Sequence, residues 1–359
     1  MQRIAVIGGG IAGLTVALRR AAAGDQVVLF EASSRLGGQL LSEAQGGFVV
    51  EHGAEGFVAR SEAVPTLAAD AAIADQLVDQ LLQQSFRYDS GKLVALAPGE
   101  AGRLLGFQVA TEELGRGIRS FRRGMGQLPE ELSLKLTTSV EFQLSTAIER
   151  ITPNASGVTV TTTTQLTHDF SAVVVATTAR SAAALLGDAF GADARALAQA
   201  SLLSSLTVTL AFRREHIDHP LDGTGFIVPA TEQLGGARAV TFASSKLPHR
   251  APDGHALLRV FFRPHPAELA ELSDAAWAER AERALGEALP LSGPSERAWV
   301  SRWPDALPVF DDAHRARVRA LERALEPQRI RLAGAAFHGS GIDAAIRSAE
   351  VAAATLGGS

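Results

Sequence analysis

Near the start of the chain, three glycines are spaced as G-x-G-x-x-G, a pattern that can hold a phosphate group. The apolar run 3–7 precedes them, and an Ala-rich run with helical periodicity, 11–23, follows them. In a strand–turn–helix, the first glycine permits a tight turn, the second lets the backbone approach a pyrophosphate, and the third allows close packing. The N–H groups at the helix start then face the anion. The expected contacts are Gly8, Gly10, Ile11, Ala12 and Gly13.

An acidic residue follows this turn, at the end of a second β-branched run, 26–30. Its carboxylate is placed to accept hydrogen bonds from the hydroxyls of a ribose. The chain continues as E-x-x-x-R-x-G-G, which is longer than the NAD fingerprint requires. This stretch resembles the FAD-dependent amine oxidases, and the resemblance implies that its arginine and glycines lie along the pyrophosphate and flavin. The residues concerned are Glu31, Ala32, Arg35, Gly37 and Gly38.

Later segments resemble one branch of that family, the protoporphyrinogen oxidases. These segments are 47–57, 121–129, 219–229, 302–308 and 339–343. The last of them precedes a predicted helix, whose positive end can stabilise a reduced flavin. The resemblance implies further cofactor contacts at Gly53, Ala54, Ile148, Ala176, Trp303, Gly334, Gly341 and Ile342. For the tryptophan, an ordinary core position is an equal alternative.

The strand and helix patterns predict an α/β fold with a Rossmann-like FAD-binding domain and an inserted α+β substrate domain that contains an antiparallel sheet. Nucleotide-binding patterns occur toward both ends of the chain, so the FAD-binding domain is expected to be discontinuous. It is expected to comprise 1–60, 131–185 and 326–359, and the substrate domain 61–130 and 186–325.

Between residues 203 and 263, short strand-like runs joined by Gly, Pro and Asp predict a meandering antiparallel sheet. Two amphipathic helices are expected after it, each with a Ser or Asp cap signal. The stretch 60–130 is expected to hold helical segments and loops. The predicted strands cover 206–212, 225–228, 239–243 and 256–262, and the predicted helices cover 273–289 and 311–325.

The composition excludes several other classes of protein. The 359 residues include 34 basic and 39 acidic ones, a net charge of −5, which offers nucleic acid no basic field. Cysteine is absent, which excludes thiolate metal sites and a cysteinyl-linked cofactor, so FAD is expected to bind non-covalently and no metal is expected. No apolar run approaches the ~18 residues of a membrane-spanning helix. A strand is predicted to begin at Arg3, so no signal peptide is expected. A cytoplasmic protein without membrane association is expected, and its oligomeric state stays open.

The chain departs from the protoporphyrinogen oxidase pattern in its substrate region. Most of a long helical stretch, which forms one wall of the family's substrate channel, is missing between Leu105 and Thr111. The family's Asn or Asp near the flavin is Glu55 here. Ser85 stands where the family has an arginine that holds a propionate, and Arg87 lies two residues further on. Glu55 and Arg87 are therefore the substrate-side candidates, and no other catalytic residue is assigned.

The resemblance implies an FAD-dependent oxidoreductase that takes a hydride from a C–H bond next to nitrogen in a small-molecule substrate. Flavin and site geometry supply most of this chemistry, so a dedicated base is not required. The sequence has no second G-x-G-x-x-G after a strand, so electrons are expected to pass to oxygen or another acceptor. The substrate stays open among protoporphyrinogen, coproporphyrinogen, another N-heterocycle and an amine. A catalytically idle flavin-binding scaffold or carrier, and a NAD-dependent dehydrogenase, are the alternatives.

Overall fold

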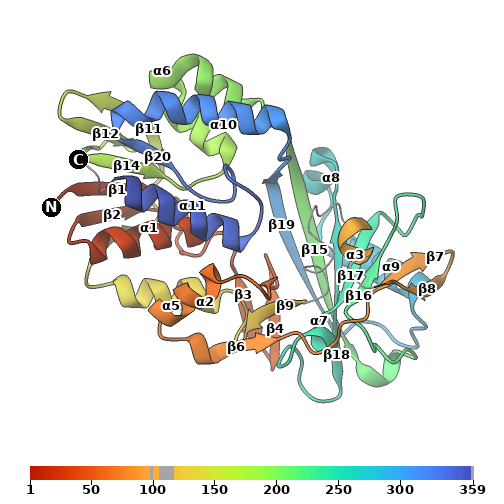
Figure 1. Ribbon diagram of the computed structural model, residues 1–359. Helices are drawn as coiled ribbons and strands as arrows, with labels where there is room; N and C mark the ends of the chain where they lie inside the picture. Colours follow the sequence, from red (N-terminus) through yellow and green to blue (C-terminus); the bar gives the residue numbers. More distant parts are fainter. Residues whose placement is uncertain (98–99, 105–116, 357–359) are drawn as a thin grey trace.

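A parallel sheet of five strands forms the middle layer of one half of the structure, a computed structural model that describes residues 1–97, 100–104 and 117–356 (Figure 1). The strand order is β10-β2-β1-β14-β20, so segments from both ends of the chain lie side by side. Every neighbouring pair of these strands is parallel. The strands are β1 (Arg3–Ile7), β2 (Gln26–Phe30), β10 (Val140–Gln143), β14 (Ala172–Val175) and β20 (Ile330–Leu332).

Both faces of this sheet are covered, which is why its strands read as continuous apolar runs. Side chains alternate along β1, so that Ile4 and Val6 pack on one face and Ala5 and Ile7 on the other. The first face carries α1 (Ile11–Ala22), α2 (Ala63–Asp70), α5 (Gln127–Leu136) and α11 (Ile342–Thr355). The second carries α6 (Ala179–Ala198), α10 (Asp312–Leu325) and a sheet of β11 (Ile148–Asn154), β12 (Gly157–Thr162) and β13 (Thr167–Phe170) (Figure 1). The predicted Rossmann-like layer is confirmed.

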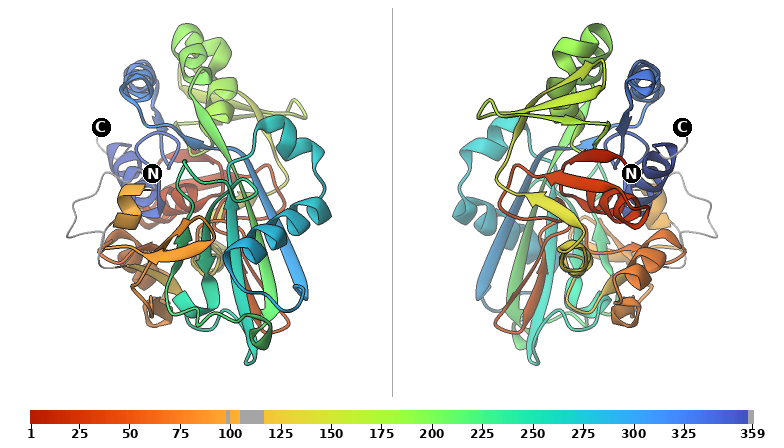
Figure 2. Two further views of the ribbon diagram at one scale, coloured as in Figure 1. Left: turned by 90° about the vertical axis from the view of Figure 1, so that its right-hand side faces the viewer. Right: turned by 90° about the vertical axis from the view of Figure 1, so that its left-hand side faces the viewer.

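A second large sheet has seven strands in the order β19-β15-β18-β17-β16-β7-β8, and its long strands face the viewer in the left view of Figure 2. Two helices, α8 (Pro266–Glu271) and α9 (Asp274–Ala288), cover one face of it around the buried Trp277. The strands are β7 (Phe86–Asp89), β8 (Lys92–Ala95), β15 (Leu202–Arg213), β16 (Gly225–Ile227), β17 (Ala237–Phe242), β18 (His255–Phe262) and β19 (Arg297–Pro308).

The predicted antiparallel sheet is present, but the prediction of a simple meander is wrong. Strand β15 pairs with β18 rather than with β16, and β16 pairs in parallel with β7. Strand β7 comes from the stretch 60–130, where the predicted helical segments are present but where no strand was predicted. Strand β19 had no clear sequence signal because Pro304 and Pro308 interrupt it; an edge strand tolerates proline, since one side of its backbone is unpaired.

The two predicted helices after this sheet are confirmed as α9 and α10. The Ser273 hydroxyl accepts a hydrogen bond from the Ala276 N–H (3.2 Å), and the Asp311 carboxylate accepts one from the His314 N–H (2.6 Å). These side chains satisfy N–H groups that the first helical turn leaves unpaired.

A hairpin of β3 (Ser42–Gln45) and β4 (Phe48–Glu51) connects the two large sheets. Phe48 and Val50 of β4 pack against Ala211 and Leu257 of the seven-stranded sheet. The predicted shortening between Leu105 and Thr111 lies outside the described residues. Within the described residues, no helix is both long and apolar enough to cross a bilayer. The remaining elements are β5 (Phe57–Val58), β6 (Leu77–Asp79), β9 (Ile118–Phe121), α3 (Glu100–Leu104), α7 (Ala243–Lys246) and the short 3₁₀ turns Ala74–Gln76, Arg214–His216 and Glu326–Gln328.

Candidate functional site

The first glycine turn lies between β1 and α1, where its three glycines have different reasons to lack a side chain. Gly8 has φ +108°, which favours glycine. A Cβ at Gly13 would lie 1.9 Å from the Gly8 carbonyl oxygen, so helix and strand pack too closely for any side chain. A Cβ at Gly10 would meet nothing nearer than the Gly38 Cα at 4.0 Å, and no side chain caps α1 there. Space and free N–H donors therefore meet at Gly10, which fits a pyrophosphate.

The stretch after β2 packs directly against this turn. Glu31 accepts hydrogen bonds from the N–H groups of Gly9 (2.7 Å) and Ser33 (2.8 Å). The Gly37 N–H donates to the Gly9 carbonyl (2.8 Å). Arg35 donates to the Gly38 carbonyl (2.8 Å), which holds its guanidinium beside the glycines. The structure thus brings the two predicted motifs together, and the neighbouring Ala32 is exposed beside them.

A loop that follows β4 reaches the same place. A Cβ at Gly53 would lie 1.7 Å from the carbonyl oxygen of Gln39, so the loop lies tightly against the second glycine stretch. The indole N–H of Trp303 donates to the His52 carbonyl (2.6 Å). Trp303 is half-buried on β19, and Ala54 continues the loop. The predicted contacts at Gly53, Ala54 and Trp303 are therefore neighbours.

The C-terminal segment supplies a second helix N-terminus. Gly334 follows β20 with φ +113°, and a Cβ there would lie 3.4 Å from the Ala12 Cβ on α1. Gly341 precedes α11 with φ +109°, no side chain caps this helix, and a Cβ at Gly341 would enter open space. The next residue, Ile342, is buried in the core. An anionic group at this end of α11 would meet free N–H donors and the positive end of the helix dipole.

The two remaining predicted contacts lie at the ends of neighbouring segments. Ala176 follows β14. A Cβ on Gly8 would lie only 2.5 Å from the Ala176 carbonyl oxygen, so the two backbone segments pack closely. Ile148 begins β11 and is half-buried. It follows Thr146, whose N–H donates to the Glu31 carbonyl (2.9 Å). Both residues therefore lie near the first glycine turn or its acidic neighbour.

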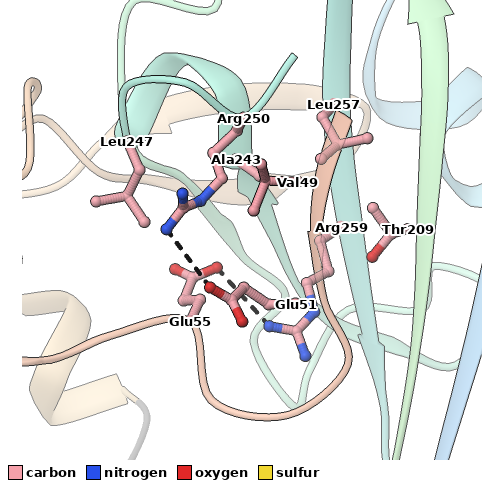
Figure 3. A pocket seen from close by; sticks show the side chains of 9 residues that line it. All are labelled: Val49, Glu51, Glu55, Thr209, Ala243, Leu247, Arg250, Leu257 and Arg259. Atoms are coloured by element: carbon pink, nitrogen blue, oxygen red, sulfur yellow. Dashed lines mark hydrogen bonds and ion pairs between the residues drawn. The ribbon is translucent and has the colours of Figure 1, made fainter. Parts of the chain in front are cut away.

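A group of charges lies beside the Gly53 loop, and we call Glu51, Glu55, Lys246, Arg250 and Arg259 the buried charge cluster. Figure 3 shows Glu51, Glu55, Arg250 and Arg259. Glu55 forms an ion pair with Lys246, and Arg259 Nη1 lies 3.9 Å from the Glu55 carboxylate. Arg250 pairs with Glu51 at 3.4 Å. No sequence pattern predicted the three cations as a group, although an arginine within the apolar run of β18 was a usable signal.

Burial and charge act in opposite directions on the two acids of the cluster. Burial raises the pKa of the Glu51 carboxyl above its ordinary value, although the charge of Arg250 opposes the shift. Burial also acts to raise the pKa of Glu55, but the charges of Lys246 and Arg259 outweigh it and leave that pKa below its ordinary value. Burial lowers the pKa of both arginines. Glu55 is therefore kept ionised by its cationic neighbours Lys246 and Arg259.

The other substrate-side candidate lies elsewhere. Arg87 is on β7 and forms an ion pair with Asp89 (2.9 Å), while Ser85 shares a hydrogen bond with Thr224 (2.8 Å). Strand β7 is five strand positions from β19, which carries Trp303. At ~4.8 Å per position, this places the two strands ~24 Å apart across the sheet. The structure does not bring Arg87 to the glycine segments.

Comparison with known proteins agrees with this arrangement of the glycine segments, the Gly53 loop and the α11 terminus. A family model described as "Flavin containing amine oxidoreductase" matches residues 70–356, and one described as "NAD(P)-binding Rossmann-like domain" matches 6–71. A coproporphyrinogen III oxidase from Propionibacterium freudenreichii subsp. freudenreichii is 32% identical over 238 residues, which are 65% of this chain and 43% of that protein. One from Bacillus subtilis (strain 168) is 24% identical over 240 residues, 66% of this chain and 50% of that protein. The match thus spans about half the length of these relatives.

Among solved structures, one named "Putative protoporphyrinogen oxidase" from Exiguobacterium sp. 255-15 has a TM-score of 0.84 at 22% identity and covers 99% of this chain and 98% of that one. Reduced UDP-galactopyranose mutase has a TM-score of 0.79 at 14% identity, with 99% and 95% covered. At such identities these likenesses show the fold alone. The family match covers most of the chain. The chain belongs to the flavin containing amine oxidoreductase family, for which FAD is the typical cofactor.

Proposed function

We propose that the protein is an FAD-dependent oxidoreductase that takes a hydride from a C–H bond next to nitrogen in a porphyrinogen-like substrate. The convergence of the glycine turn, the second glycine stretch, the Gly53 loop and the α11 terminus on one region carries this proposal. The coproporphyrinogen III oxidases among its relatives support the substrate class. The domain division 1–60, 131–185 and 326–359 against 61–130 and 186–325 is part of the proposal, as is a cytoplasmic location.

Several of the predicted residues have a defined role toward the cofactor in this proposal. The free N–H groups at Gly10 would hold the pyrophosphate, and Glu31 would accept hydrogen bonds from a ribose. The α11 N-terminus at Gly341 would stabilise negative charge on the ring. FAD, when bound, supplies the hydride acceptor. Because the chain has no cysteine, binding without a thioether follows.

The buried charge cluster makes Glu55 unsuited to take a proton from the substrate. Protonation would leave Lys246 and Arg259 facing an uncharged partner in a buried site, which is costly. The proposal therefore assigns no dedicated base, and the substrate proton passes to solvent. Arg87 is partly exposed and could contact a substrate carboxylate. That contact would lie away from the glycine segments.

The experiment that tests this function is anaerobic mixing of the FAD-loaded protein with coproporphyrinogen III or protoporphyrinogen, followed by air. We expect flavin absorbance to bleach with one of them, to return in air, and porphyrin absorbance to appear. NADH and NADPH serve as controls and should bleach the flavin poorly. Tight FAD binding without bleaching by either porphyrinogen would instead support the idle scaffold. Failure to bind FAD, or rapid stoichiometric reduction by NADH, would overturn the proposal.

A further inference from the structure

Two side chains of the seven-stranded sheet hold successive carbonyl groups of the Gly53 loop. Trp303 of β19 donates to the His52 carbonyl (2.6 Å), and Arg259 of β18 donates through Nη2 to the Gly53 carbonyl (2.6 Å). Strands β19 and β18 flank β15, so the two donors come from either side of one strand. The sheet therefore helps to fix the position of the loop, together with the loop's own His52 and Glu55 side chains, which contact Ser301 and Lys246.

The loop has little freedom on its opposite side. A Cβ on Gly53 would lie 1.7 Å from the Gln39 carbonyl oxygen and 2.8 Å from its carbonyl carbon. Backbone rather than a flexible side chain makes this contact, so the neighbour cannot easily move away. The loop is thus enclosed between Arg259 on one side and the second glycine stretch on the other.

Arg259 is itself immobilised. It is 3% exposed, and its Nη2 lies 3.3 Å from the Thr207 hydroxyl while its Nη1 faces Glu55 at 3.9 Å. Its guanidinium carbon lies 4.7 Å from the centroid of the Phe261 ring. A planar guanidinium donates in fixed directions, and a buried charge that loses its partners is costly, so each contact restrains the others.

We propose that Arg259 is a positioning residue for the cofactor contacts at Gly53 and Ala54, acting through the Gly53 carbonyl. The inference rests on the proposed function, because it takes Gly53 and Ala54 as flavin contacts. Through this bond the seven-stranded sheet determines where the loop stands relative to the second glycine stretch. Cofactor affinity and the environment of the bound flavin then depend on a residue that lies more than 200 positions away in sequence from the loop it holds.

A second buried arginine provides a matched control. Arg250 is 2% exposed and belongs to the same buried charge cluster. It donates to the Ser120 hydroxyl (2.7 Å), to the Phe121 carbonyl (3.2 Å) and to Glu51 (3.4 Å). The bond to Gly53 comes from Arg259. Loss of either arginine disturbs a buried ion pair, but only loss of Arg259 releases the loop.

The experiment compares Arg259→Met, Arg259→Lys, Arg250→Met and Arg250→Lys with the wild type. The measurements are the Tm of each apoprotein, the Kd for FAD by fluorescence quenching, and the visible circular dichroism of the bound flavin. We expect both Met variants to lower Tm. Arg259→Met alone should raise the Kd by about tenfold or more and change the flavin dichroism, since a charged hydrogen bond is lost. Arg259→Lys, which keeps the charge, should recover much of the Tm but only part of the affinity.

The outcomes separate this inference from the proposed function. If the wild type does not bind FAD, the proposed function fails, and the inference with it. If the wild type binds FAD, but the Arg259 and Arg250 variants weaken binding equally with an unchanged dichroism, only the inference is overturned. Should Arg259→Met fail to fold, the Lys variants decide: equal affinity and dichroism in Arg259→Lys and Arg250→Lys would contradict the positioning role.

Discussion

The Glu31 carboxylate accepts a hydrogen bond from the Gly9 N–H at 2.7 Å and so joins the end of β2 to the glycine turn after β1. Its second oxygen accepts from the Ser33 N–H at 2.8 Å. The acid that was expected to meet a ribose therefore also holds the backbone of the two motifs that would bind the cofactor. One side chain combines a structural and a binding task.

Replacement of Glu31 by Gln tests this double role. A glutamine has one acceptor oxygen in place of two, so one of the Gly9 and Ser33 bonds is lost, along with an acceptor for the ribose. We expect the Kd for FAD to rise by about tenfold, and the free energy of unfolding to fall by about 1 kcal/mol. Glu287→Gln, on the exposed side of α9, should leave both unchanged. An unchanged Kd in Glu31→Gln would contradict the ribose role.

The glycines of the first turn should respond differently to alanine. Gly10 has an extended backbone and open space at its Cβ, so Gly10→Ala should keep the Tm of the apoprotein yet weaken FAD binding by more than tenfold. Gly13→Ala places a Cβ 1.9 Å from the Gly8 carbonyl oxygen and should lower the Tm sharply. Gly187→Ala, in α6 with nothing near its Cβ, is the control and should stabilise slightly. Equal Tm losses for Gly10→Ala and Gly13→Ala would refute this distinction.

Trp303 can be compared with a tryptophan on the same strand. Trp303→Phe keeps an aromatic ring but removes the donor to the His52 carbonyl, so we expect the Kd for FAD to rise about two- to tenfold. Trp299 donates to the Glu43 carboxylate (3.1 Å) instead. Trp299→Phe should therefore leave FAD affinity unchanged. If the two variants lose affinity to the same extent, Trp303 acts only as a core residue.

The two acids of the buried charge cluster should affect stability with opposite dependence on pH. Glu51 has a raised pKa in the fold, so the stability contributed by this shift is present below the unfolded pKa of ~4.3 and is lost as pH rises. Glu51→Gln should therefore gain stability relative to the wild type as pH rises. Glu55 has a lowered pKa, so its contribution is present above ~4.3 and is lost as pH falls. Relative to the wild type, Glu55→Gln should be destabilised most near neutral pH.

Urea unfolding of the two variants and the wild type between about pH 4 and 7 measures these differences. Each unit of pKa shift changes the free energy of unfolding by about 1.4 kcal/mol across its window. If the difference in free energy of unfolding from the wild type changed with pH in the same direction for Glu51→Gln and Glu55→Gln, the two carboxyls would share one environment.

The sequence by itself determined the parts of this protein whose geometry depends on near neighbours. The turn at Gly8 and Gly10 follows from a strand, a glycine and a helix that are adjacent in the chain, and the E-x-x-x-R-x-G-G stretch follows it directly. Strand β14 is a fully buried apolar run without alternation, as expected of a parallel strand covered on both faces. Local backbone preferences and burial patterns suffice for these features.

Only the tertiary structure decided which distant segments meet. Arg259 reaches Gly53 because β18 lies between β15 and β17 and faces the loop after β4, and no spacing in the sequence encodes that contact. The pairing of β7 with β16 likewise joins segments far apart in the chain. Such contacts depend on how whole sheets pack, since many pairings of similar strands satisfy the same alternation of side chains. The placement of the buried charges, and the separation of Arg87 from the glycine segments, arise at that level.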